Sequence, residues 1–312
     1  FARMAVISVL PVPGTPVITS LIKAVLRAAD KRVPMRQPAV SGSFYPSSKQ
    51  ELETQIEESY SKAEAGSKPG NANDIAASVC PHAGYMYSGW VAAFAYSRIA
   101  SAFSNPPSFV IIGPNHTGQG RPVALSQQDW RTPLGIAKND AELGREIAKC
   151  GSMIDLDERA HEFEHSIEVQ VPFLQKIYGE KVRIVPICLG MQNMDSAKDV
   201  AEAVQKASAR LKRDAFIIAS SDFTHFESAQ SAKMRDAHAL DALKRLDEGK
   251  FFEQVRLRNL TICGYGPILT AMHYARLKGC RRAEILKYAS SGDITGDYNS
   301  VVAYCGAVFP LR

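Results

Sequence analysis

The sequence predicts a single α/β domain, a sandwich of helices around a mainly parallel or mixed β-sheet. Short apolar runs of strand length alternate with helical patterns along the chain, which is the order that strand–helix–strand units give. Three of the runs, at 75–80, 109–112 and 215–219, each lead directly into a turn that carries histidine. Because ligands of open α/β sheets bind outside the carboxyl ends of the strands, these turns predict a functional site.

The helices are predicted from apolar stripes at helical spacing and from their capping residues. Ser47 or Ser48 can cap the first, and Ser88 can cap the second at Gly89. Pro172 is expected in the first turns of the fourth, where a missing N–H is tolerated. In chain order the predicted helices cover residues 48–65, 89–103, 141–149, 167–178, 197–211, 229–248, 251–257 and 264–277.

The strands are predicted from short apolar runs bounded by turn residues. The last two of them close the chain, and the acidic stretch 151–163 is expected to be irregular. In chain order the predicted strands cover residues 75–80, 109–112, 123–125, 182–189, 215–219, 284–289 and 300–309.

Residues 1–34 differ in composition from the rest of the 312-residue chain. Their apolar stretch is interrupted by prolines and falls short of the ~20 uninterrupted residues that a membrane span needs. We interpret them as an extension outside the core fold, ahead of a natural start at Met35; a targeting or membrane-surface segment is the alternative. Residues 35–312 then form the α/β domain, with a Gly/Ser/Asn-rich link at 66–73.

The composition excludes several classes of function. The net charge of +5 belongs mainly to residues 1–34, which hold five basic side chains and one acidic one, so no nucleic-acid-binding face is indicated. The six cysteines form no CxxC pair, which is typical of a reducing, cytoplasmic location. Walker A and G-x-G-x-x-G motifs are absent, so no nucleotide cofactor is predicted.

The histidine-bearing turns after these strands favour a metal site. His82 and His116 would supply two nitrogens from adjacent strand ends, and the third donor could be Asp222, His225 or Cys263. Cys263 stands at the start of a helical pattern, where the helix dipole lowers a thiol pKa. Two histidines with a carboxylate suit non-haem Fe(II), whereas two histidines with a thiolate suit copper or zinc.

Other residues have simpler interpretations. His165 could reach the site from its helix start, while His238 and His273 lie within helical patterns and are expected to be structural. A nucleophile at Ser220 or Ser221, served by the histidine and the carboxylate of the same turn, would place a whole triad on six residues, which is geometrically awkward. Taken singly, a histidine in a turn is more often hydrogen-bonded or solvated than functional. The shared position of these histidines at strand ends is what favours a functional role for the group.

Five segments of the chain resemble signature segments of the Memo family, in the family's order and across essentially all of residues 35–312. The lead-in at 39–45 resembles the family's start as well. The five segments are Pro-His-Ala-Gly-Tyr at 81–85, Gly-Pro-Asn-His at 113–116, Glu-His-Ser-Ile-Glu at 164–168, Ser-Ser-Asp-Phe-Thr-His at 220–225 and Thr-Ile-Cys-Gly at 261–264.

The resemblance implies a fold similar to that of class III extradiol ring-cleaving dioxygenases, which hold non-haem iron. It implies that His82, His116 and Cys263 are the metal ligands, with Asp222 beside them and His225 in the place of the catalytic base. Those dioxygenases use a glutamate where this chain has Cys263, which argues against classical ring cleavage. The family also implies an iron or copper ion, redox chemistry, and radical-SAM proteins as partners of archaeal and bacterial members.

Two classes of function follow from these observations. The first is a metal-dependent oxidoreductase, favoured by His225, because a simple binding protein has no evident need of a base. The second is a non-catalytic protein that uses the pocket to bind a metal or a peptide, favoured by the thiolate, which softens the open iron site of oxygen chemistry. The small-molecule or peptide ligand is not specified by the sequence.

Overall fold

The computed structural model describes residues 35–64 and 75–311. The predictions for the extension at 1–34 and for the link at 66–73 lie outside the described residues. The unit that begins at Met35 is described by itself.

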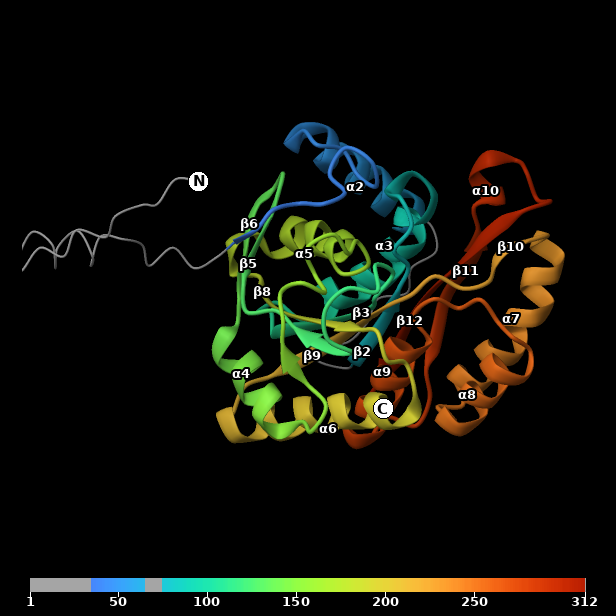
Figure 1. Ribbon diagram of the computed structural model, residues 1–312. Coiled ribbons are helices and arrows are strands. Elements are labelled where there is room, and N and C mark those ends of the chain that lie inside the picture. Colours follow the sequence, from blue (N-terminus) through green and yellow to red (C-terminus); the bar gives the residue numbers. More distant parts are fainter. Residues whose placement is uncertain (1–34, 65–74, 312) are drawn as a thin grey trace, which may run out of the picture. The chain divides into compact units, whose positions relative to one another are not determined.

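Twelve strands of the described residues form one mixed sheet, shown in Figure 1. Nine of them follow one another along the sheet in the order β1 (Met35–Arg36), β5 (Asp129–Thr132), β6 (Gly135–Asn139), β8 (Arg183–Leu189), β3 (Ser108–Pro114), β9 (Ala215–Ser220), β2 (Ile75–Cys80), β12 (Val301–Pro310) and β10 (His225–Glu227). Off this path, β11 (Glu284–Ser290) pairs with β12, and β4 (Val123–Leu125) pairs with β7 (Asp155–Leu156) and β8.

The centre of the sheet is parallel. The neighbours β6, β8, β3, β9 and β2 run in the same direction, whereas β12 is antiparallel to β2, and β11 to β12. Every residue of β2 and β3 is buried, as expected for parallel strands covered on both faces. The predicted α/β sandwich around a mainly parallel or mixed sheet is therefore confirmed.

Helices cover both faces of the sheet (Figure 1). On one face lie α2 (Lys49–Glu64), α3 (Tyr85–Ala102) and α5 (Val171–Tyr178), and on the other α4 (Ala141–Cys150), α6 (Met194–Leu211) and α9 (Tyr265–Leu277). The remaining helices are α7 (Ala229–Lys244), α8 (Glu248–Leu257), α10 (Gly292–Thr295) and the short 3-10 turns η1 (Glu168–Gln170) and η2 (Gly179–Lys181).

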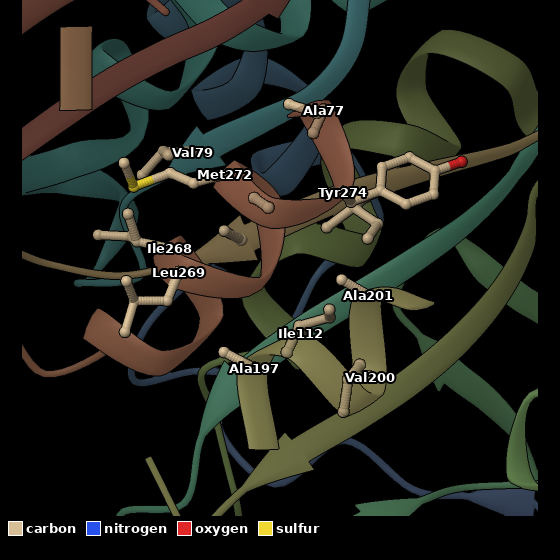
Figure 2. Close-up of a cluster of buried hydrophobic side chains, with 14 of the residues drawn as sticks. Ala77, Val79, Ile112, Ala197, Val200, Ala201, Ile268, Leu269, Met272 and Tyr274 are labelled. Atoms are coloured by element: carbon tan, nitrogen blue, oxygen red, sulfur yellow. The ribbon is translucent and has the colours of Figure 1, made fainter. Parts of the chain in front are cut away.

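The core on the second face is dominated by small and branched side chains. Figure 2 shows Val200 of α6 and Leu269 and Met272 of α9 beside Ile112 of β3 and Val79 of β2. All five are buried completely. Burying such side chains is worth roughly 1.5–3 kcal/mol each, so this layer fixes the strands whose ends carry the histidine turns.

Several helix boundaries differ from the prediction by three or four residues, and those of α3 and α7 have a visible cause. Helix α3 begins at Tyr85 rather than Gly89, because Gly84 is its N-cap, and the Ser88 hydroxyl donates to the Ala83 carbonyl instead of capping. Helix α3 thus begins directly after the His82 turn. Helix α7 ends at Lys244, before the predicted 248, and a separate α8 begins with Asp247 as its N-cap.

The hairpin of β5 and β6 was not predicted. Its strands are short and mostly polar, and only Trp130, Thr132 and Ala137 are buried, so no apolar run marks them. The hairpin turns through two residues to Gly135, whose φ of +125° favours glycine.

Candidate metal centre

The turns after β2 and β3 and the residue before helix α9 meet at one point. His82, His116 and Cys263 each offer one ligand atom there, and these atoms lie within 4.8 Å of one another. The His82 Nε2 is 3.1 Å from the Cys263 Sγ, and the two imidazole ring centres are 5.2 Å apart. Among the described residues, neither Asp222 nor His225 joins a group of this kind. Strand β9 lies between β2 and β3, so the two histidines do not leave adjacent strands as predicted.

Two closely packed glycines allow the turns to come this near. A Cβ on Gly264, the residue after Cys263, would collide with the carbonyl oxygen of Ser220 and the side chain of Ser221. A Cβ on Gly113 would collide with the side chain of Ser166. Both positions therefore require glycine for steric room, although neither has a positive φ.

Each histidine of the group makes a hydrogen bond through its other ring nitrogen. The His116 Nδ1 is 2.9 Å from the Glu164 Oε1, and the His82 Nδ1 is 2.9 Å from the Ser220 Oγ. Metal-binding histidines are commonly oriented by such partners, which leave the second nitrogen free for the ion. Two free imidazole nitrogens beside a thiol are a donor set that suits a copper, zinc or iron ion.

Burial keeps the imidazoles of His82 and His165 neutral. Burial, together with the neighbouring histidines, holds the pKa of His82 well below its usual range, and burial lowers the pKa of His165 to about 4. Burial alone would raise the pKa of Glu164, but the hydrogen bond and charge of His116 and the Ser166 N–H bring it down to about 2. His82 and His165 are therefore neutral beside the ionised Glu164 carboxylate.

The expectation that the helix dipole lowers the pKa of Cys263 is wrong for the protein without an ion. Burial raises the pKa of this thiol, and the nearby Asp222 carboxylate raises it further. Cys263 precedes Gly264, the N-cap of α9, and its Sγ accepts a hydrogen bond from the Asp222 N–H at 3.3 Å, which is too little to offset the desolvation. The thiol stays protonated until a cation replaces its proton.

His82 and His116 border a cavity of about 600 Å³, whereas Cys263 is not among its lining residues. His165 belongs to its wall: its ring stacks on His116 at 4.6 Å and also contacts the ring of Phe44. His165 therefore lies at the cavity wall beside His116. The cavity is lined by Phe44, His82, Ala83, Gly84, Tyr87, His116, His165, Asp222, His225, Ser291, Thr295, Asp297, Ser300, Val302 and Tyr304.

His225 is held by the cysteine segment rather than by Asp222. Its Nδ1 is 2.9 Å from the Thr261 carbonyl oxygen, and its backbone N–H donates to the Thr261 Oγ1 at 2.8 Å. The Asp222 carboxylate instead accepts the backbone N–H of His82 at 2.8 Å, and burial raises the pKa of Asp222. Because a carbonyl only accepts, the His225 Nδ1 carries the proton and its Nε2 is left as a basic nitrogen.

His238 and His273 lie in helices, as their patterns predicted. His238 is exposed on α7, and the buried His273 pairs with Glu248 at 3.0 Å across α8 and α9. His161 is buried and donates through its Nε2 to the Ala124 carbonyl at 3.1 Å. None of the three belongs to the cavity wall.

Several residues of the site were not assigned a role from the sequence. Glu164 lies inside one of the resembling segments, which is the one signal that could have drawn attention to it. Gln170, Ser220 and Thr261 act through contacts with residues 36 to 138 positions away, and no local pattern marks such contacts. The sequence suggested only a nucleophilic role for Ser220. In the structure Ser220 is fully buried and its Oγ contacts the His82 Nδ1.

Comparison with known proteins shows the family of this chain. The family model described as Memo-like protein matches residues 36–308. The chain belongs to the Memo family. Three relatives named as MEMO1 family proteins come from archaea. The protein from Methanosarcina acetivorans is 43% identical, with 88% of this chain and 98% of the relative covered. Those from Methanopyrus kandleri and Sulfolobus acidocaldarius are 43% and 42% identical, again with 88% of this chain covered and with 98% and 99% of the relatives.

A solved structure shares the fold. The uncharacterized protein JW3007 from Escherichia coli K12 superposes with a TM-score of 0.51 at 12% identity, over 75% of this chain and 99% of that one. At this identity the likeness shows the fold alone. Membership of the Memo family supports the dioxygenase-like fold that the resemblance implied. Within the described residues, no helix has the length and apolar character to cross a membrane.

Proposed function

We propose that this Memo-family protein is a metal-dependent redox protein that holds one iron or copper ion on His82, His116 and Cys263. The observation that carries the proposal is the convergence of their three ligand atoms within 4.8 Å, with His82 and His116 at the wall of a cavity of about 600 Å³. The residues come from three distant parts of the chain, and the close packing at Gly113 and Gly264 leaves no room for a Cβ there. Ligand-type side chains that converge in this way are candidates for a functional site.

Binding of the ion is coupled to a proton. The Cys263 thiol must lose its proton to become a ligand, whereas an imidazole binds a metal through a ring nitrogen that carries no proton. A redox-active ion held there would supply one-electron chemistry. The cavity beside it would admit a small organic molecule, and Phe44, Tyr87 and Tyr304 give it apolar walls.

His225 is the group best placed to move a proton for a bound molecule. It lines the same cavity, its Nδ1–H is fixed by the Thr261 carbonyl, and its Nε2 is free to accept. General acid–base help of this kind is typically worth ~10²–10⁴-fold in rate. Asp222 supports the site differently, by holding the backbone of the His82 turn.

The test replaces His225 by glutamine. His225→Gln should fold and bind the metal like the parent, because it leaves the three ligands intact, but metal-dependent oxygen consumption or substrate turnover should fall ~10²-fold or more. His238→Gln, on the exposed face of α7, is the matched control. Metal content by mass spectrometry and oxygen uptake with a reductant are the measurements.

The alternative function is a non-catalytic metal- or peptide-binding protein that reuses the pocket. It is favoured by Cys263, since a thiolate is a softer and more tightly bound ligand than the carboxylate of oxygen-activating iron sites. If His225→Gln matches the parent in every redox assay in which Cys263→Ala fails, this alternative replaces the base role. The cytoplasmic location and the radical-SAM partners stay predictions.

A further inference from the structure

The side of the His82 ring that faces away from the cavity is embedded in the protein. His82 is 2% exposed, and its Nδ1 lies 2.9 Å from the Ser220 Oγ. The distance alone does not say which atom carries the hydrogen, because a hydroxyl can donate or accept. The hydrogen-bond partners around Ser220 decide it.

Gln170 is fixed first. Its Nε2 is 2.9 Å from the Pro81 carbonyl oxygen and 2.8 Å from the Ser220 Oγ, and its Oε1 accepts the Tyr96 hydroxyl at 2.7 Å. A carbonyl cannot donate, so the amide nitrogen and not the amide oxygen must face Pro81. Both amide hydrogens are therefore used, one on Pro81 and one on Ser220.

Ser220 follows from Gln170. Its Oγ is 2.6 Å from the Ser166 carbonyl oxygen, which can only accept, so the single hydroxyl hydrogen points there. The Gln170 amide occupies one of the two lone pairs of this Oγ. The Oγ has no hydrogen left for His82 and can only accept from it, so the His82 Nδ1 must carry the proton.

We infer that Ser220 and Gln170 are positioning residues that hold His82 as its Nδ1–H tautomer and so present an unprotonated Nε2 to Cys263. The Nε2 lies 3.1 Å from the Cys263 Sγ, at the point where the three ligand atoms meet. The consequence for metal affinity rests on the proposed function, whereas the tautomer does not. His116 is prepared in the same way, by the ionised Glu164 on its Nδ1.

This arrangement links the ligand to the core of the fold. Ser220 ends β9, Gln170 ends η1, and both are buried to within 1% of full burial. The ring plane and the tautomer of His82 are thus set before any ion binds, and binding requires no exchange of ring protons. Partners of metal-binding histidines typically contribute 10–100-fold to metal affinity.

The first test uses the unaltered full chain freed of metal by chelation. Long-range proton–nitrogen NMR correlates each histidine ring nitrogen with its ring protons and distinguishes protonated from unprotonated nitrogens. The His82 signals are assigned by their loss in His82→Gln. We expect Nδ1 to be protonated and Nε2 unprotonated near neutral pH. A protonated Nε2, or a mixture of the two tautomers, overturns the inference whatever the protein does with metals.

The second test removes the Ser220 hydroxyl, which accepts the hydrogen bond from the His82 Nδ1. Ser220→Ala should populate both His82 tautomers and raise the dissociation constant for Zn²⁺, used as a redox-silent probe, by ~10–100-fold. Ser208→Ala removes a buried hydroxyl elsewhere in the fold, on α6, and should change neither the tautomer of His82 nor the dissociation constant for Zn²⁺. An unchanged tautomer and an unchanged affinity in Ser220→Ala would overturn the positioning role. If the parent binds neither Zn²⁺ nor iron nor copper, the proposed function fails instead, and the NMR result decides the tautomer on its own.

Discussion

At the scale of the residue, burial decides the protonation of the site. The imidazoles of His82 and His165 are kept neutral because a positive charge is poorly solvated there. The same burial keeps the Cys263 thiol protonated, although a thiolate is the form that binds metal. A metal ion favours the thiolate, and its binding releases the thiol proton. Metal affinity should therefore rise with pH.

A buried histidine outside the site makes the stability of the protein depend on pH. His161 is 1% exposed, and burial, with the nearby Arg36 charge, lowers its pKa to about 4. In the unfolded chain it titrates near 6.5, so the unfolded state takes up the proton first as the pH falls. The contribution is complete above pH 6.5 and is lost progressively as the pH falls towards 4, and it amounts to about 3 kcal/mol.

His161→Gln should therefore flatten the decline in the free energy of unfolding between pH 6.5 and pH 4. Urea titrations of the metal-free protein across this range measure the slope, with His238→Gln as the exposed control. A His161→Gln protein that loses stability as steeply as the parent would show that His161 is protonated in the folded state.

At the scale of the element, the site depends on how closely the turn before α9 approaches the end of β9. Gly264 lies against the Ser220 carbonyl and the Ser221 side chain, and its N–H donates to the Ser221 Oγ at 3.0 Å. Gly264→Ala must push the two segments apart, because backbone atoms cannot yield like a flexible side chain. We expect the displacement to move Cys263 away from His82 and to lower metal affinity at least tenfold.

The measurement for Gly264→Ala is a metal titration together with a thermal melt. Gly249→Ala in α8 is the matched control, because a Cβ there meets only the end of the Asp247 side chain and alanine favours a helix. Equal affinity in Gly264→Ala and the parent would mean that the cysteine segment does not need this close contact.

The sequence allowed the central elements to be predicted because their burial leaves a local pattern. Strands β2 and β9 were located to within a residue, since strands covered on both faces are continuously apolar. The β5 and β6 hairpin escaped prediction, because half-exposed polar strands leave no such run. The first residue of helix α3 was predicted too far along the chain, because Ser88 resembles an N-cap in the sequence. In the structure its hydroxyl donates a hydrogen bond to the Ala83 carbonyl.

The site was predictable in part for the same reason. The turns after apolar strands indicated His82, His116 and the Asp222 turn, since parallel strands end at one edge of the sheet. Position alone left the third ligand open, and the structure groups Cys263 with the two histidines. The partners of the ring nitrogens, such as Ser220, depend on packing between distant segments and could not be read from spacing.

At the scale of the whole molecule, the lead-in that resembles the family's start is tied to the segment beside the site. Arg36 and Glu168 form an ion pair at 2.6 Å, with side chains 4% and 1% exposed. The Glu168 carboxylate also accepts the Tyr45 hydroxyl and the backbone N–H groups of Ala39 and Val40. Glu168 is two residues from Gln170, so a buried network joins the start of the described fold to the segment that carries Gln170.

The central claim is that one ion is held by His82, His116 and Cys263. The most direct measurement is the metal content per chain of untagged protein purified without added metal, for the parent and for Cys263→Ala. Cys150→Ala, which alters a free cysteine of similar exposure on α4, is the control. The account predicts close to one iron or copper ion per chain in the parent and in Cys150→Ala, and little in Cys263→Ala. Equal metal content in Cys263→Ala and the parent would contradict it.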